Sequence, residues 1–340
     1  MGKRTRRNKK RVKGRKTRKG KTRKGKRRKT RKGKSLKGKK PTIGVLTVPL
    51  SPNKKFFSVC GDSYISESHI GWLKRNGINV VAIPFTTKKH KLWMKRVNGL
   101  YFPSGGAFAV TQNEYYKGCK QFLRLAMKEN DKGNHFPIWG GCMGMQQMMI
   151  IAEGSDNLNN LLQRFDSYKN LMCTLELTED GINSRMIKSL PENFVKQLQK
   201  KKCTLNNHKM GLTPSKFKKH KALDGFFKIV STSKDRKNRK FVSTIEGRHY
   251  PFYGVQWHPE RDYISMNELA KFLKNELRKN GKKAHGTTRK LYSKVIDCWG
   301  YSDSLYKKCK FYWHKKTSKH NRKLCNAAQL EKKKPDEAGV

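Results

Sequence analysis

The chain has 340 residues and a formal net charge of +56, of which 25 positive charges lie in residues 1–40, where no acidic residue occurs. No run of about 18 apolar residues is present, which argues against a membrane span, and the basic start lacks the apolar stretch of a secretory signal peptide. The 8 cysteines show no framework spacing, so we expect mostly reduced thiols.

Residues 1–40 repeat short basic segments such as KTRKGK, and we expect them to form a disordered arm. Such a segment repels itself and has nothing to bury in a core. It suits contact with nucleic-acid phosphates, and runs such as Lys26–Lys29 resemble nuclear import signals. A solubilising tail or a general polyanion binder is the alternative. Without aromatic residues to stack on bases, sequence-specific binding is not expected.

The pattern that follows is typical of a β-α-β unit. Thr42–Val48 and Val80–Pro84 predict buried strands. Between them, apolar residues at helical spacing over Tyr64–Asn76 predict a helix, which Gly77 would end. A strand, a helix and a strand joined in this way favour a parallel sheet.

A third strand is predicted over Val97–Phe102, followed by the loop Pro103-Ser104-Gly105-Gly106. In isolation a plain turn is the more frequent explanation of a glycine pair, but beside a nucleophile elbow the backbone N–H groups of Gly105 or Gly106 suit an oxyanion donor. A long amphipathic helix is then predicted over Asn113–Asn130.

The segment Phe136–Ile151 indicates a nucleophile elbow, in which a short strand, a sharp turn and a helix follow one another. Cys142 lies at the turn, within Gly140-Gly141-Cys142-Met143-Gly144. Gly140 and Gly144 would leave room for the turn, the helix N-terminus would favour the thiolate of Cys142, and the Met143 N–H could donate to an oxyanion. The alternative is a buried structural cysteine beside a glycine-rich turn.

The next segment is less regular. Leu171–Leu177 predicts a strand and Ser189–Gln199 a helix, and His208 follows between polar residues, where a histidine is usually a surface group. Phe226–Thr232 and Phe241–Ile245 alternate like paired strands.

Within the segment Tyr250–Glu260, Tyr253–Trp257 predicts a strand that ends at His258, because Pro259 cannot continue it. The carboxyl edge of a parallel sheet is where α/β proteins place their sites. Glu260 could hold the His258 ring nitrogen that is not used in chemistry, as in a nucleophile–histidine–acid triad. A purely structural histidine–carboxylate pair is the alternative. Ile264–Lys279 predicts a closing helix.

Residues 281–340 form a basic extension with scattered aromatic residues, for which we expect a small helical module or a partly folded tail. Its cysteines and histidines do not have the spacing of zinc ligands, so we expect no metal.

Residues 41–280 resemble the gamma-glutamyl hydrolases (folate polyglutamate hydrolases) of the class I glutamine amidotransferase-like superfamily. The resemblance rests on PTIGVL, YISESHIGWL, NGLYFPSGG, FPIWGGCMGMQ, NSRMIKSLP, NNHK and STIEGRHYPFYGVQWHPE. It implies an α/β fold, a flavodoxin-like three-layer sandwich with a central, mostly parallel sheet. The chain would then comprise the arm 1–40, a catalytic domain 41–280 and the extension 281–340.

The resemblance also implies the roles of individual residues. Cys142 would be the nucleophile, His258 the general base and acid, and Glu260 the orienting carboxylate. Met143, with Gly105 or Gly106, would supply the oxyanion N–H groups; the family pattern is Pro-Gly-Gly, whereas this chain has Pro-Ser-Gly-Gly. His208 would lie near the substrate. Gln146, in a Met-Gln pair typical of the amidotransferase branch, would contact it too.

The function implied is cleavage of γ-glutamyl amide bonds, above all in folyl poly-γ-glutamates, through a thioester and without a cofactor or metal. A glutamine amidotransferase subunit and a non-enzymatic basic protein that kept the fold are the alternatives. A homodimer is possible. The family suggests a lysosomal, vacuolar or extracellular enzyme, whereas the arm suggests the nucleus or a nucleic-acid-rich particle.

Overall fold

A computed structural model describes residues 40–49, 63–105, 113–154, 161–261, 266–281, 295–298 and 309–312. Residues 1–39, which make up nearly all of the expected basic arm, lie outside these ranges, so disorder and nucleic-acid contact of the arm stay predictions. Within the described part of the chain, no helix is both long and apolar enough to cross a membrane.

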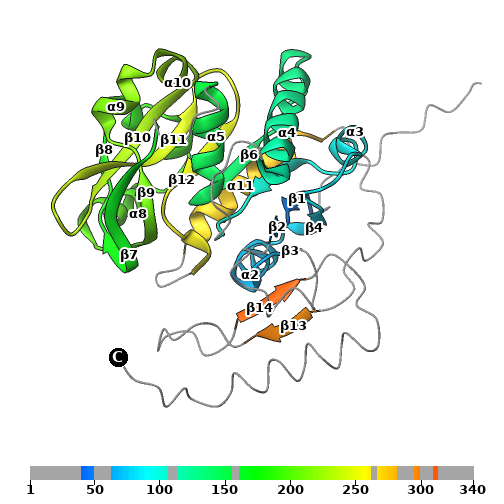
Figure 1. The fold of residues 1–340 in the computed structure, drawn as a ribbon, viewed down its shortest axis with the longest axis horizontal. Coiled ribbons are helices and arrows are strands. Elements are labelled where there is room, and N and C mark those ends of the chain that lie inside the picture. The colour runs from blue at the N-terminus through cyan, green and yellow to red at the C-terminus, as the bar shows by residue number, and fades with distance from the viewer. Residues whose placement is uncertain are drawn as a thin grey trace, which may run out of the picture. The chain divides into compact units, whose positions relative to one another are not determined.

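An eight-stranded sheet forms the centre of the described residues between 40 and 281 (Figure 1). The first five strands in the order are parallel neighbours, and the last three are antiparallel, as expected of a mostly parallel sheet. In spatial order the strands are β4 (Asn79–Ile83), β1 (Thr42–Leu46), β5 (Gly99–Phe102), β6 (Ile138–Gly141), β12 (Phe252–Val255), β11 (Lys240–Gly247), β10 (Phe227–Lys234) and β8 (Glu176–Leu177).

Helices cover both faces of this sheet and bury two separate apolar cores, which gives the expected three layers. One face carries α3 (His90–Met94), α4 (Glu114–Asp131), α5 (Met143–Glu153), α9 (Pro214–Lys219) and α10 (Lys221–Phe226). The other carries α2 (Glu67–Arg75), α7 (Arg185–Lys188), α8 (Glu192–Lys200) and α11 (Asn267–Lys279). Side chains alternate between the faces along β5, with Tyr101 in one core and Leu100 and Phe102 in the other.

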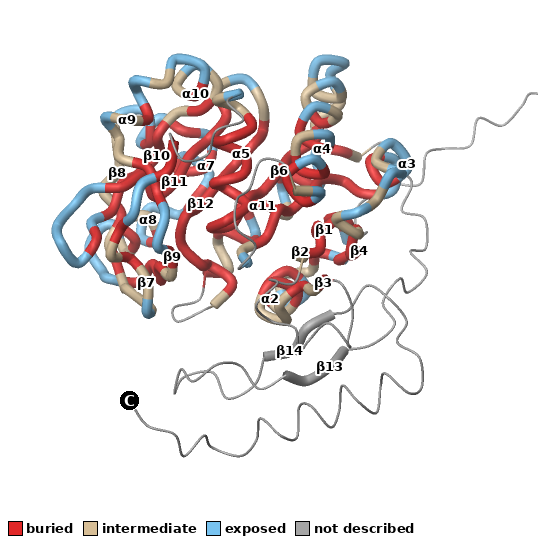
Figure 2. The backbone as a smooth tube through the Cα atoms, in the orientation of Figure 1, coloured by how far each residue is buried: buried red, intermediate tan, exposed pale blue. Residues whose placement is uncertain are grey.

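The helix boundaries follow the signals in the sequence. Asn113 accepts a hydrogen bond from the Tyr116 N–H and so caps α4. Gly77 and Gly154 follow α2 and α5 with φ values of +73° and +82°, a conformation that glycine adopts without steric cost. The central strands and α5 are almost entirely buried (Figure 2), which explains why their sequences are apolar.

Three two-stranded ribbons complete the described structure. The longest pairs β7 (Gln163–Cys173) with β9 (Thr204–Gly211), and a short one pairs β2 (Val48–Pro49) with β3 (Ser63–Tyr64). In the C-terminal extension, β13 (Val295–Cys298) pairs with β14 (Cys309–Tyr312). The two described stretches of the extension are therefore strands rather than the expected helical module. Cys119, Cys142, Cys173 and Cys203 are free thiols, as the spacing predicts.

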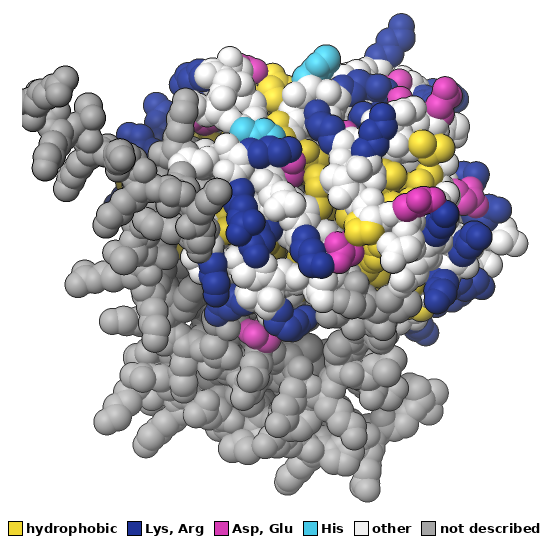
Figure 3. Space-filling view, turned by 180° about the vertical axis from the view of Figure 1, so that it is seen from behind, with side chains coloured by type: hydrophobic (Ala, Val, Ile, Leu, Met, Phe, Trp, Pro, Cys, Tyr) yellow, Lys and Arg dark blue, Asp and Glu magenta, His cyan; other side chains and the backbone are white. Residues whose placement is uncertain are grey.

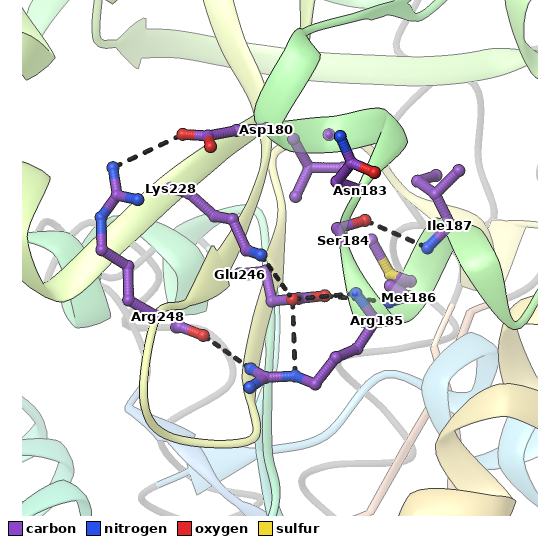
Figure 4. Close-up of polar contacts among 12 residues, drawn as sticks. Asp180, Asn183, Ser184, Arg185, Met186, Ile187, Lys228, Glu246 and Arg248 are labelled. Carbon is purple, nitrogen blue, oxygen red and sulfur yellow. Dashed lines mark hydrogen bonds and ion pairs between the residues drawn. The ribbon is translucent and has the colours of Figure 1, made fainter.

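A buried carboxylate ties the short helix α7 to the sheet (Figure 4). Glu246 on β11 is fully buried and accepts hydrogen bonds from the backbone N–H groups of Arg185 and Met186, at 3.0 and 2.9 Å. The side chains of Arg185 and Lys228 lie 3.4 and 3.3 Å from the same carboxylate. The Arg185 guanidinium also donates to the Gly247 carbonyl. These contacts give the NSRMIKSLP segment its place in the fold.

We expect Glu246→Ala to lower the free energy of unfolding by about 3 kcal/mol, because it leaves buried N–H groups and two cations without their acceptor. Urea unfolding followed by circular dichroism measures this change. Glu192→Ala is the matched control, since Glu192 pairs with Lys196 in an exposed position and its loss should leave the unfolding midpoint unchanged. An equal stability of wild type and Glu246→Ala would show that the buried carboxylate is not needed.

Candidate active site

Cys142 lies at a strained turn between β6 and α5. Its φ is +48° and ψ is −103°, unusual values for a residue with a side chain, and it precedes the first residue of α5. A Cβ on Gly144 would lie 1.8 Å from the Phe102 carbonyl oxygen, and one on Gly140 would lie 2.9 Å from the Met145 nitrogen. Only glycine fits at either position, as the elbow motif predicts.

The sheet brings His258 to this turn. β6 and β12 are parallel neighbours, with Gly141 opposite Val255, and the Cys142 N–H donates to the Val255 carbonyl at 2.6 Å. His258 follows β12 at the carboxyl edge of the sheet. The Glu260 Oε1 atom lies 2.7 Å from His258 Nδ1, and both side chains are buried. The structure therefore brings together the three residues expected to form the triad.

Charge interactions, rather than solvent, set the ionisation of this pair. Burial opposes the protonated form of His258, but Glu260 and Cys142 outweigh it and raise the pKa of His258 to about 9. Burial likewise opposes ionisation of Glu260, yet His69, His258 and Arg261 lower the pKa of Glu260 to about 2. Between these values an imidazolium and a carboxylate face each other. A carboxylate only accepts hydrogen bonds, so His258 Nδ1 carries a proton.

Two glutamines form a hydrogen-bonded chain that ends at the Cys142 sulfur. The Met210 carbonyl accepts from Gln146 Nε2 at 2.8 Å, and the second N–H of that amide faces the Gln256 Oε1 atom at 3.2 Å. Gln256 Nε2 is thereby oriented to donate to Cys142 Sγ, 3.5 Å away. Sequence reasoning missed Gln256. The signal was its position two residues before His258, since extended backbone places such residues on the same face.

His208 is buried within β9 and not on the surface, which corrects the expectation from its polar neighbours. Burial lowers its pKa to about 3, so the ring is neutral near pH 7. The Nδ1 atom lies 2.8 Å from the Met210 carbonyl and must donate to it, which leaves Nε2 as an acceptor. This buried Nε2 atom has no partner among the described residues. The β7–β9 ribbon places His208 near His258, whose charge acts on it.

The expected oxyanion donors are placed only in part. Met143 is the first residue of α5, so its N–H lies at the helix N-terminus beside Cys142. A Cβ on Gly105 would lie 3.3 Å from the Met143 Cε atom, which puts Gly105 next to this helix start. Gly106 lies outside the described residues. That Met143, with Gly105 or Gly106, donates to an oxyanion stays a prediction.

A second histidine, which sequence reasoning did not single out, also lies at Glu260. His69 on α2 is buried, with its Nε2 atom 2.8 Å from Ser104 Oγ and 3.7 Å from Glu260 Oε1. Ser104 Oγ is 3.3 Å from the same carboxylate oxygen. No local sequence motif predicts these contacts, because His69, Ser104 and Glu260 come from separate elements of the chain.

Comparison with known proteins agrees with this geometry. The family model described as "Glutamine amidotransferase class-I" matches residues 59–280, and the chain belongs to this class. More closely, it is 34% identical to the gamma-glutamyl hydrolase of Homo sapiens over 71% of this chain and 79% of the relative. It is 28% identical to gamma-glutamyl hydrolase B of Dictyostelium discoideum, over 72% and 74%, and 30% identical to gamma-glutamyl hydrolase 1 of Arabidopsis thaliana, over 68% and 66%. The chain is therefore a member of the gamma-glutamyl hydrolase family.

Proposed function

We propose that this protein is a hydrolase of γ-glutamyl amide bonds that uses Cys142 as its nucleophile. The observation that carries the proposal is the arrangement around the elbow: Cys142 lies at a strained turn, it is one of the groups that raise the pKa of His258, and Glu260 Oε1 lies 2.7 Å from the Nδ1 atom of that histidine. The family membership gives the bond type, because relatives from animals, plants and Dictyostelium carry the name gamma-glutamyl hydrolase. Neither observation requires a cofactor.

The reaction proceeds in two halves. The Cys142 thiolate attacks the γ-carbonyl carbon, and the N–H groups of Met143 and Gly105 stabilise the oxyanion that forms. Protonated His258 gives its Nε2 proton to the leaving nitrogen, so the amide C–N bond breaks and a γ-glutamyl thioester remains. The neutral ring then takes a proton from water, whose oxygen attacks the thioester, and the carboxylic acid leaves as the thiolate returns.

The substrate is a poly-γ-glutamyl chain, which carries one α-carboxylate per residue. Lys and Arg are spread across the described surface and outnumber acidic side chains there (Figure 3). A basic surface attracts a polyanion at long range, and salt weakens this attraction. In this proposal the basic surface of the described residues attracts the substrate, and the buried side chains near Cys142 recognise its γ-glutamyl group.

His208 and Gln146 are the recognition residues in this proposal. The Nε2 atom of His208, which has no partner among the described residues, is a buried acceptor. The amide nitrogen of Gln146 makes the hydrogen bonds to Met210 and Gln256, so its side-chain oxygen is not used in them. Both offer acceptors, which suit the N–H donors of an α-amino or amide group.

In the wild type, His208 packs edge-on against Phe241, with ring centroids 4.9 Å apart. His208→Phe removes the acceptor but keeps a ring in this position. We expect kcat/KM to fall about 10-fold, because a substrate donor would be left unpaired in a buried site. Steady-state kinetics on a γ-glutamyl peptide measure this loss. Phe165→Leu, which changes another ring that packs edge-on against Phe241, is the control for altered packing. Unchanged kinetics of His208→Phe would remove His208 from the recognition site.

Mass spectrometry of pteroyl-pentaglutamate incubated with the full chain tests the proposed function. Shortened glutamyl chains that appear with wild type and not with a Cys142 variant support it, and their lengths distinguish internal from terminal cleavage. Release of ammonia from free glutamine, without any cleavage of the pentaglutamate, would instead place the protein with the amidotransferases. An absence of both reactions would contradict an enzymatic function.

A further inference from the structure

A second chain of buried polar side chains leads to the carboxylate of Glu260. Tyr101 Oη lies 2.7 Å from His69 Nδ1, His69 Nε2 lies 2.8 Å from Ser104 Oγ, and Ser104 Oγ lies 3.3 Å from Glu260 Oε1. Tyr101 and His69 are 0% and 1% exposed. Three separate elements, β5, α2 and the loop after β5, thus converge on the residue that orients His258.

The donors and acceptors of this chain have one consistent direction. The Glu260 carboxylate only accepts, so the single Ser104 proton points to it. Ser104 Oγ is then an acceptor for His69 Nε2–H. Burial lowers the pKa of His69 to about 4, so near neutral pH its other nitrogen carries no proton and accepts from the Tyr101 hydroxyl. Every proton in the chain points from Tyr101 toward Glu260.

We propose that His69 and Ser104 are positioning residues that hold Glu260 in the orientation its hydrogen bond to His258 requires. The inference rests on the proposed hydrolase function. Ser104 is also the residue by which this chain departs from the Pro-Gly-Gly pattern expected of the family, and a glycine there would have no hydroxyl to give.

The need for such a restraint follows from how Glu260 is bonded. Ser104 and His258 both contact Oε1, while Oε2 has no partner among the described residues. The terminal torsion of a glutamate has a broad energy minimum, so a carboxylate bonded through one oxygen can rotate. A second donor on Oε1 limits this rotation. His69 in turn fixes the serine, because Ser104 by itself is a short side chain with several rotamers.

Ser104→Ala tests the proposal, with the whole chain and a γ-glutamyl peptide as substrate. We expect kcat to fall about 10-fold with KM nearly unchanged, the effect of losing one hydrogen bond to a charged group. The alkaline limb of the pH profile should move to lower pH, because a mobile carboxylate holds the proton of His258 less firmly. His69→Phe should act in the same direction. Ser104→Thr keeps the hydroxyl and should restore both properties.

A substrate-independent measurement separates this proposal from the proposed function. The rate at which iodoacetamide alkylates Cys142, followed on its peptide by mass spectrometry, depends on the protonated His258 nearby. We expect the midpoint pH of alkylation to rise in Ser104→Ala, even if no γ-glutamyl substrate is cleaved. Two other titratable or charged groups face this pair: His208, on which the charge of His258 acts, and Arg261, which lowers the pKa of Glu260. Both stay in place in these variants.

Ser68→Ala is the matched control, because Ser68 precedes His69 on α2 but bonds to Ser66. It should leave the kinetics and the alkylation midpoint at their wild-type values. The proposal is overturned if Ser104→Ala has wild-type kinetics and midpoint, or if its kcat falls only in step with the folded fraction. An upward shift of the alkaline limb would also overturn it, since Ser104 would then compete with His258 for Glu260.

Discussion

Replacing Cys142 with alanine is expected to lower kcat/KM for γ-glutamyl cleavage by at least about 10⁴-fold, because no other group at the elbow can form the thioester. Alanine keeps the Cβ atom and is under the same backbone strain at φ +48°, so the turn itself should persist. Circular dichroism and thermal unfolding should therefore match those of wild type. Steady-state kinetics and single-turnover mass spectrometry measure the effect, the latter by the γ-glutamyl mass on the Cys142 peptide.

Cys119→Ala is the matched control for this experiment. Cys119 is a buried free thiol on α4, outside the elbow, and burial raises its pKa well above the ordinary thiol value. A small loss of stability with full activity is expected, since only a packing contact is removed. Activity that survives in Cys142→Ala would refute the cysteine mechanism, whichever residue carried the reaction instead.

Glu260→Gln is expected to lower kcat/KM on the order of 10³-fold, although the change replaces one oxygen with nitrogen. A neutral amide cannot stabilise protonated His258, and its N–H₂ group can force the ring into the wrong tautomer. The pKa of His258 should fall from about 9 toward its ordinary value of 6.5. The alkaline limb of the pH–rate profile should move down with it, because protonated His258 is needed to release the leaving nitrogen.

The stability of this variant should also differ from wild type in a pH-dependent way. In the wild type the pKa of His258 is raised on folding. Its contribution to the free energy of unfolding is therefore fully present below pH 6.5 and is lost as pH rises through about 9. The pKa of Glu260 is lowered, so its contribution is present above pH 4.5 and is lost as pH falls through about 2. The difference in free energy of unfolding should therefore be largest between pH 4.5 and 6.5. A difference that is flat from pH 3 to 10 would contradict the ion pair.

The sequence predicted correctly those site residues whose contacts lie close to them along the chain. Gly140 and Gly144 flank Cys142 and reveal the elbow by themselves, and Glu260 stands two residues from His258. The β-α-β periodicity was likewise enough to predict the parallel sheet. In each case the physical constraint acts within one element or between adjacent ones.

Contacts between elements that are distant in the sequence were either not predicted or predicted wrongly. The polar neighbours of His208 by themselves predict a surface position, yet the β7–β9 ribbon buries it. Only the family resemblance predicted that it lies near the substrate. His69 and Ser104 meet Glu260 only after α2, β5 and β12 have taken their places. The C-terminal extension shows the same limit, because its paired strands β13 and β14 lie in a sequence that has no clear alternation.

The position of β12 has a consequence for the newly made chain. β12 inserts between β6 and β11 and carries His258 with it, so a ribosome must release almost the whole catalytic domain before the site can close. Until then the thiol of Cys142 has no imidazolium beside it, and β6 presents an open edge to any other strand in the cell. A chain that terminates before β12 would therefore have an inactive Cys142 thiol and would be prone to aggregate through the open edge of β6.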